Sequence, residues 1–98
     1  MAYQYEFANS AEGDLDKLIK HNPALAVQLI TEHIPRIVRD PKAAGEKKTG
    51  ELSHLRAYGF SFRRVACRIV YDVDDERKCV TLIAIGIHDV AYDRARKR

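Results

Sequence analysis

The stretch RIVYDVDDERKCVTLIAIGIHDVAY, residues 68–92, decides the predicted fold. It predicts two apolar strands joined by a charged turn at residues 74–78, followed by a short segment. Side chains on a strand alternate between its two faces. On the first strand one face carries Ile69, Tyr71 and Val73, and the other carries Arg68, Val70 and Asp72. One face can therefore join the core while the other stays free for chemistry.

The second strand of this pair, residues 79–87, is apolar on both faces, which is typical of a central strand. Regular alternation places Val80, Leu82, Ala84 and Gly86 on one of its faces. Because Ala84 and Gly86 are small, we expect room above the sheet there. Arg68 is expected to face this room, and His88 shares it if the strand extends that far.

The residues before this pair predict one strand and two helices. Residues 2–7 alternate like a strand, and residues 9–20 place their apolar side chains on one helical face. A second helix is predicted from Asn22-Pro23 to Asp40-Pro41, because proline is well tolerated at a helix start. Pro35 lies inside it, where the ring removes one backbone hydrogen bond and collides with the preceding turn. We therefore expect a kink or break at Pro35.

The middle of the chain predicts a loop and one more strand. Residues 41–50 have the proline, glycine and charged residues of a loop. Residues 58–65 alternate, with Phe60 and Phe62 toward the core and Arg63 on the opposite surface. If Val65 and Ala66 make a tight turn, Arg63 and Arg68 become near neighbours across two strands.

These elements predict one α+β domain over residues 1–98, in the order β-α-α-β-β-β with a short C-terminal helical segment. Both helices are expected on one face of a largely antiparallel four-stranded sheet. The chain has 98 residues, 46% hydrophobic and 32% charged, which suits a single core.

Composition also predicts the compartment. The cysteines Cys67 and Cys79 flank the hairpin without facing each other, so two reduced thiols are expected. There is no apolar run of membrane-spanning length, and residues 1–7 alternate like a strand instead of forming a signal peptide. We expect a soluble, cytoplasmic protein that does not engage a membrane.

Charge is unevenly distributed along the chain. Residues 1–46 hold five Lys/Arg against seven Asp/Glu, a balance of −2, and residues 47–98 hold twelve against seven, a balance of +5. The basic second half indicates either a polyanionic partner or a merely solvated surface.

Several catalytic templates are excluded. The histidines His21, His33, His54 and His88 lack metal-ligand spacing, and no CxxC pair is present, so no metal site is predicted. There is no phosphate-binding glycine loop and no nucleophile elbow. What remains is a reaction without metal or cofactor, or binding alone.

The polar face suits RNA cleavage by the 2′-hydroxyl. Its candidate catalytic residues are Arg63, Arg68, His88 and Tyr92. Histidine carries protons near neutral pH, and guanidinium groups stabilise the negative charge that develops on phosphate. Further basic residues are expected to contact RNA: Lys47, Lys48, Arg56, Arg64, Arg94 and Arg96. The alternatives are arginines paired with Asp72, a surface histidine, a packed tyrosine and a solvated lysine loop.

A set of patterns spans nearly the whole chain. These are Tyr3-Gln4-Tyr5-Glu6-Phe7, a helix pair ending at Asp40-Pro41, a basic loop before Gly50-Glu51-Leu52, the strand Arg68-Ile69-Val70-Tyr71, the apolar strand to Ile85-Gly86, and Val90-Ala91-Tyr92. Together they resemble the RelE/ParE superfamily of small toxins from bacterial toxin-antitoxin pairs, with the RelE branch favoured. The Arg-Ile-Val-Tyr strand and the Ile-Gly to Tyr spacing are the most specific pieces.

This resemblance implies a compact toxin held inactive by an acidic antitoxin and, in the RelE branch, metal-independent cleavage of mRNA in the ribosomal A site. Arg68 matches the phosphate-binding arginine before the Val-Tyr pair, and Tyr92 matches a C-terminal tyrosine that assists proton transfer. Arg63 fits a basic position on the preceding strand.

The chain also departs from the family pattern. His88 stands where many ribonuclease members have an arginine, and implies either a histidine general acid, as in some relatives, or altered chemistry. The lysines that RelE-type enzymes carry on the preceding strand fall at about Gly59 and Ser61. Lys47 and Lys48 are the candidates to replace them from the loop.

Two functions from different classes therefore stand. The first is a ribosome-dependent endoribonuclease that inhibits translation, favoured because Arg68, His88 and Tyr92 occur together. The second is a ParE-like toxin that inhibits DNA gyrase by binding alone. An inert or antitoxin-bound scaffold is the third, structural alternative.

Overall fold

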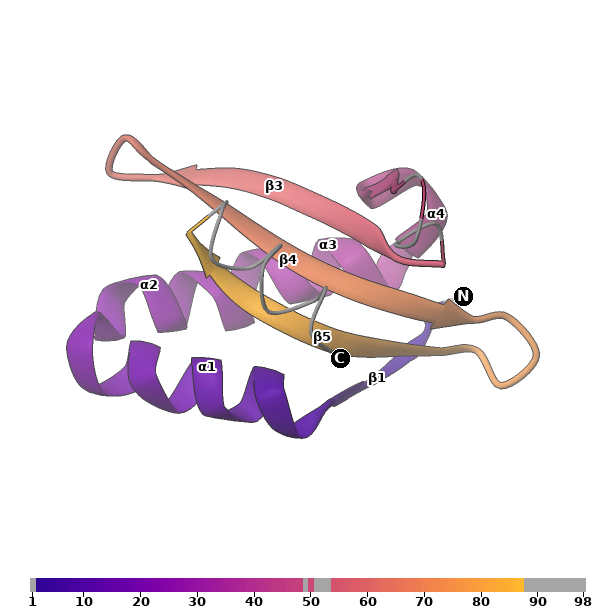
Figure 1. Cartoon of the computed structure of the whole chain (residues 1–98), viewed down its shortest axis with the longest axis horizontal. Helices are drawn as coiled ribbons and strands as arrows, with labels where there is room; N and C mark the ends of the chain where they lie inside the picture. The colour runs from indigo at the N-terminus through magenta and orange to yellow at the C-terminus, as the bar shows by residue number, and fades with distance from the viewer. Residues whose placement is uncertain (1, 49, 51–53, 88–98) are drawn as a thin grey trace.

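The computed structural model describes residues 2–48, 50 and 54–87 of the chain. In order, the elements are β1 (Gln4–Phe7), α1 (Asn9–His21), α2 (Pro23–Gln28), the π-helical turn η1 (Leu29–His33), α3 (Ile34–Arg39), α4 (Pro41–Ala44), β2 (Glu46–Lys47), β3 (Arg56–Phe62), β4 (Val65–Asp74) and β5 (Cys79–Ile87). The helices α1, α2 and α3 lie on one side of the sheet (Figure 1). None of the helices described is both long enough and apolar enough to cross a bilayer.

The sheet has the strand order β1-β5-β4-β3-β2 within the described residues. β1 runs parallel to β5, and the other neighbours are antiparallel, so the predicted α+β class and largely antiparallel sheet are confirmed. The predicted count of four strands is wrong. The additional strand, β2, lies in the segment predicted as a loop, which also contains α4. The predicted C-terminal helical segment falls outside the described residues.

The predicted second helix is divided into α2, η1 and α3. The predicted number of two N-terminal helices is therefore also too low. The α-helical hydrogen bonding changes just before Pro35, where Ile34 N–H donates to the Leu29 carbonyl five residues back. Pro35 then falls in the first turn of α3, directly after η1, where its missing N–H leaves one backbone hydrogen bond unmade. The predicted break therefore appears only as a π-helical change of hydrogen bonding, because the backbone stays helical from Pro23 to Arg39.

The turn between β3 and β4 is not where the sequence predicted it. Phe62 pairs with Val65, so Arg63 and Arg64 form the turn in place of Val65 and Ala66. Both arginines have positive φ, 50° and 70°, as a two-residue hairpin turn that follows the strand twist requires. A β-branched valine is poorly suited to positive φ, which disfavours the predicted turn. Arg63 is consequently removed from the strand face that carries Arg68.

The hairpin between β4 and β5 has the predicted turn but an unpredicted bulge. Asp74 pairs with Cys79 across the charged turn. Val70 pairs with Ala84 and Tyr71 with Leu82, which leaves Ile83 as an extra residue on β5. The bulge reverses the alternation, so the predicted common face of Leu82 and Ala84 is wrong.

The core lies between the sheet and the helices. Its members are Ala11, Leu29, Ile34, Ile37, Tyr58, Ile69, Tyr71, Val80, Leu82 and Ile85. Ile69 and Tyr71 are fully buried there, as predicted. A smaller apolar group of Leu55, Val70 and Ala84 packs separately. Cys67 and Cys79 are both free thiols, and their strand partners are Ile87 and Asp74, so they do not face each other.

A buried histidine joins the π-helical turn to the sheet. His33 is 4% exposed, and its ring stacks on Phe60 with centroids 3.9 Å apart. Its Nδ1 lies 2.8 Å from the Tyr58 hydroxyl, and its Nε2 lies 3.2 Å from Gln28 Nε2. Since the amide nitrogen of Gln28 can only donate, this arrangement corresponds to neutral His33 with its proton on Nδ1. Burial, and then the charge of Arg36, hold the pKa of His33 below its ordinary value.

Acidification should therefore destabilise the fold through His33. Because the pKa is lowered in the native state, the unfolded state binds a proton first, and stability falls as pH drops below about 6.5. Urea unfolding at pH 7.5 and at pH 5.5 should show this loss in the wild type and in His21→Gln, which alters an exposed histidine. His33→Gln should lose less stability over the same interval. An unchanged pH dependence in His33→Gln would contradict the assignment.

Candidate functional site

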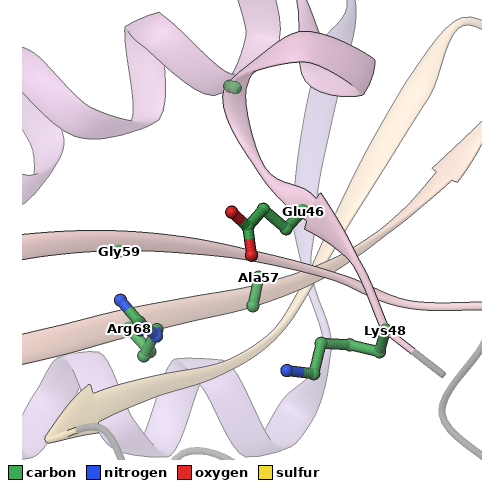
Figure 2. Close-up of a pocket in the computed structure, with 6 residues that line it drawn as sticks. Glu46, Lys48, Ala57, Gly59 and Arg68 are labelled. Atoms are coloured by element: carbon green, nitrogen blue, oxygen red, sulfur yellow. The ribbon is translucent and has the colours of Figure 1, made fainter.

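The face of the sheet opposite the helices carries a polar cavity of about 270 Å³. It is lined by Ala44, Glu46, Lys48, Ala57, Gly59 and Arg68. On β3, Ala57 and Gly59 alternate with core residue Tyr58, and on β4, Arg68 precedes core residue Ile69. Strand alternation therefore directs the cavity side chains away from the helices. In Figure 2, the side chains of Glu46, Lys48 and Arg68 surround Ala57, and a nitrogen of Arg68 lies near Gly59.

β2 brings two opposite charges to this cavity. Glu46 pairs with Ala57, and Lys47 pairs with Arg56. The backbone of Lys48 continues the alignment, because its N–H donates to the Leu55 carbonyl at 2.9 Å. Glu46 and Lys48 are two residues apart and line the cavity together, whereas Lys47 does not line it.

Hydrogen bonds from the sheet hold the segment that precedes β2. The Tyr71 hydroxyl donates to the Pro41 carbonyl at 2.5 Å, and the Arg56 guanidinium donates to the carbonyls of Lys42 and Gly45 at 2.9 and 3.1 Å. Burial is the main cause that raises the pKa of Tyr71 to about 12, so this phenol stays a donor. These bonds hold the backbone just before Glu46 in place, and so set the position from which the side chains of Glu46 and Lys48 extend.

Arg68 lies between two glycines in the sheet. It pairs with Gly59 on β3 and with Gly86 on β5. Arg68 therefore lies beside the small residue Gly86, as predicted, and a second small residue, Gly59, borders it on the other side. Arg68 is half-buried, and its guanidinium is one of the two cationic groups at the cavity.

Among the described residues, two cations and one carboxylate line the cavity. A guanidinium and an ammonium favour a bound anion, and a phosphate offers oxygens to both. A carboxylate beside them can accept a proton from a bound hydroxyl. This set of groups suits a reaction that deprotonates a hydroxyl next to a phosphate.

Only part of the predicted site is brought together here. Arg68 and Lys48 line the cavity, but Arg63 and Arg64 lie in the β3–β4 turn, where the Arg63 guanidinium covers the Phe62 ring at 4.9 Å. Lys47 and Arg56 line a separate hollow with Asp72 and Asp75. His88, Tyr92, Arg94 and Arg96 lie outside the described residues.

Sequence reasoning missed Glu46. Residues 41–50 were predicted to be a loop, and a loop gives no fixed direction to its side chains. The available signal was the Glu-Lys-Lys order, in which residues 46 and 48 share a face if the segment is extended.

Comparison with protein families matches residues 14–96 to the model described as "ParE-like toxin of type II bacterial toxin-antitoxin system". Comparison with curated proteins gives no significant match.

Solved structures share the fold. A chain of the RelBE2 toxin-antitoxin complex from Mycobacterium tuberculosis has a TM-score of 0.73 and 23% identity, with 89% of this chain and 99% of that chain covered. The isolated RelE toxin of Escherichia coli has a TM-score of 0.67 and 23% identity, covering 95% and 98%. The YoeB dimer from Staphylococcus aureus has a TM-score of 0.67 and 20% identity, covering 90% and 99%.

Proposed function

We propose, from the premise that this chain belongs to the family of ParE-like toxins of type II bacterial toxin-antitoxin systems, that it is a metal-independent endoribonuclease. The proposed target is mRNA at the ribosome, and the consequence is inhibition of translation. The observation that carries this proposal is the convergence of Glu46, Lys48 and Arg68 on one cavity. The similarity of the fold to RelE and YoeB toxins supports it.

The reaction follows from the three charged groups. Glu46 accepts the proton of a ribose 2′-hydroxyl, whose oxygen then attacks the adjacent phosphorus. Lys48 and Arg68 stabilise the additional negative charge on the pentavalent phosphate. The bond to the 5′ oxygen breaks, which leaves a 2′,3′-cyclic phosphate and a 5′-hydroxyl. His88 remains the predicted acid that protonates the leaving oxygen, and Tyr92 the predicted assistant in proton transfer.

A cognate antitoxin is the expected partner in the resting state. Its acidic character is proposed from the net charge of +3 on this chain. The RelBE2 structure is a toxin-antitoxin complex, which supports a protein partner of this kind. Copurification of a small acidic protein with a tagged toxin, expressed from its own operon, tests this part of the proposal.

Induced expression in a bacterial host tests the activity. The expected result is rapid translation arrest, with mRNA cut inside ribosome-bound reading frames. The upstream fragment of each cut message should carry a 2′,3′-cyclic phosphate at its new 3′ end. No observation on the described residues favours gyrase inhibition. Intact messages together with altered DNA supercoiling and an SOS response would overturn the ribonuclease proposal, and unimpaired growth would favour an inert scaffold.

The neighbouring lysines provide a matched test of the cavity. Lys48→Ala should lower the cleavage rate about tenfold to a hundredfold, the effect of losing one hydrogen bond to a charged group. Lys47→Ala removes the same charge one residue away but leaves the cavity lining intact, so its rate should stay near that of the wild type. Cleavage of a ribosome-bound message by the two purified variants measures the difference. Equal losses would contradict the assignment of Lys48 to the site.

A further inference from the structure

The residue opposite Arg68 on β3 has no side chain, and the guanidinium occupies the space that results. A Cβ built at Gly59 would lie 1.7 Å from Nη1 of Arg68 and 2.8 Å from Cζ. Real side chains do not approach so closely, so Arg68 can hold this position only while residue 59 is glycine. The arginine side chain therefore crosses from β4 over the backbone of β3.

The side chain of Arg68 points toward Gly59 and not toward Gly86, its other glycine neighbour. Among the described residues, a Cβ built at Gly86, its partner on β5, would have no atom within 4 Å apart from those of its chain neighbours. The guanidinium thus leans toward β3 and β2, where Glu46 and Lys48 line the cavity, and away from β5 (Figure 2).

The backbone does not itself require glycine at position 59. Gly59 lies within β3, and the described glycines with positive φ are Gly50 and Gly86. A glycine inside a strand weakens the strand and often marks the close approach of another group. Here the approaching group is the guanidinium of Arg68.

We propose that Gly59 is a positioning residue, which gives Arg68 the slot through which its guanidinium reaches the phosphate beside Glu46 and Lys48. This inference rests on the proposed ribonuclease function. The small size of residue 59 thereby has a role in catalysis. A side chain there would displace the guanidinium from the slot, although Arg68 would keep its charge.

Gly59→Ala tests the proposal with Ser61→Ala as its control. Ser61 is exposed two residues further along β3, so both changes leave alanine on the same strand face. Gly59→Ala should lower kcat for cleavage of a ribosome-bound message about tenfold to a hundredfold, because a misplacement near 1 Å can cost that much. Thermal unfolding should be unaffected, since the atoms in the way belong to the end of a flexible side chain. Ser61→Ala should match the wild type in both measurements.

A double-mutant cycle separates positioning from a general effect on the strand. In the Arg68→Ala background, Gly59→Ala should change the rate by less than about twofold, since no guanidinium is left to displace. Independent losses that multiply would overturn the proposal. If Gly59→Ala failed to fold, recovery of folding in the double variant would support the slot, and continued failure would overturn it.

A measurement without RNA keeps this inference distinct from the ribonuclease proposal. The Nε–H signal of Arg68, assigned with Arg68→Lys, should shift in an ¹⁵N NMR spectrum of Gly59→Ala and remain unchanged in Ser61→Ala. Titration with inorganic phosphate should move this signal in the wild type at lower concentrations than in Gly59→Ala. Unaltered signal and titration would overturn the positioning role, whereas absence of cleavage by the wild type would overturn only the ribonuclease activity.

Discussion

Replacing Arg68 with alanine should lower the rate of mRNA cleavage about 10²- to 10³-fold, equivalent to ~3–4 kcal/mol of transition-state stabilisation. Arg68 is the cation of the cavity held between two glycines, and its guanidinium offers fixed donors where the phosphate gains charge. The fold should survive, because Arg68 lies on the face opposite the helix-packed core. Single-turnover cleavage of a ribosome-bound message measures the loss directly.

Arg77→Ala is the matched control for this prediction. Arg77 is exposed in the β4–β5 turn, and its replacement changes the net charge by the same amount. A comparable loss in Arg77→Ala would indicate that overall charge, and not the cavity, governs activity. Full toxicity and normal cleavage in Arg68→Ala would overturn the assignment of Arg68.

Glu46→Gln should lower kcat about 10²- to 10⁴-fold while leaving KM nearly unchanged. Glutamine keeps the shape of the side chain and its ability to accept a hydrogen bond, but it cannot take the 2′ proton at neutral pH. Because glutamine also removes a negative charge beside the phosphate, RNA binding should not weaken. The split between kcat and KM therefore distinguishes a general base from a binding residue.

Glu76→Gln removes the same charge from the exposed β4–β5 turn and should leave kcat unaltered. Cleavage by Glu46→Gln at the wild-type rate would exclude Glu46 as the base. A rise in KM with normal kcat would instead indicate a role in binding.

Sequence patterns predicted the strands and their core faces well where the periodicity was uninterrupted. Ile69 and Tyr71 are buried as their alternation indicates, and Pro35 interrupts the α-helical hydrogen bonding as its chemistry requires. The errors occur where a single backbone event changes the register. The bulge at Ile83 exchanges the faces of the β5 residues on its two sides, and the turn at Arg63-Arg64 changes which residues of β3 and β4 are paired. Neither event has a strong local signature.

The candidate site was only partly predictable for a related reason. Arg68 could be recognised from its strand, but Glu46 belongs to a two-residue strand that exists because β3 pairs with it. Its position further depends on Tyr71 and Arg56, which bind the backbone carbonyls of the preceding segment. Hydrogen bonds between segments so far apart produce no periodic pattern in the local sequence.

The sequence by itself determined that this chain is an α+β domain and that residues 68–87 belong to its central hairpin, because burial of apolar faces imposes a period that can be read locally. The tertiary structure alone decided the neighbours of Arg68. It placed the guanidinium over Gly59 and brought Lys48, rather than Lys47 or Arg63, to the same cavity. These neighbours are fixed by strand register, and register is a relation between distant segments, set only when the sheet assembles.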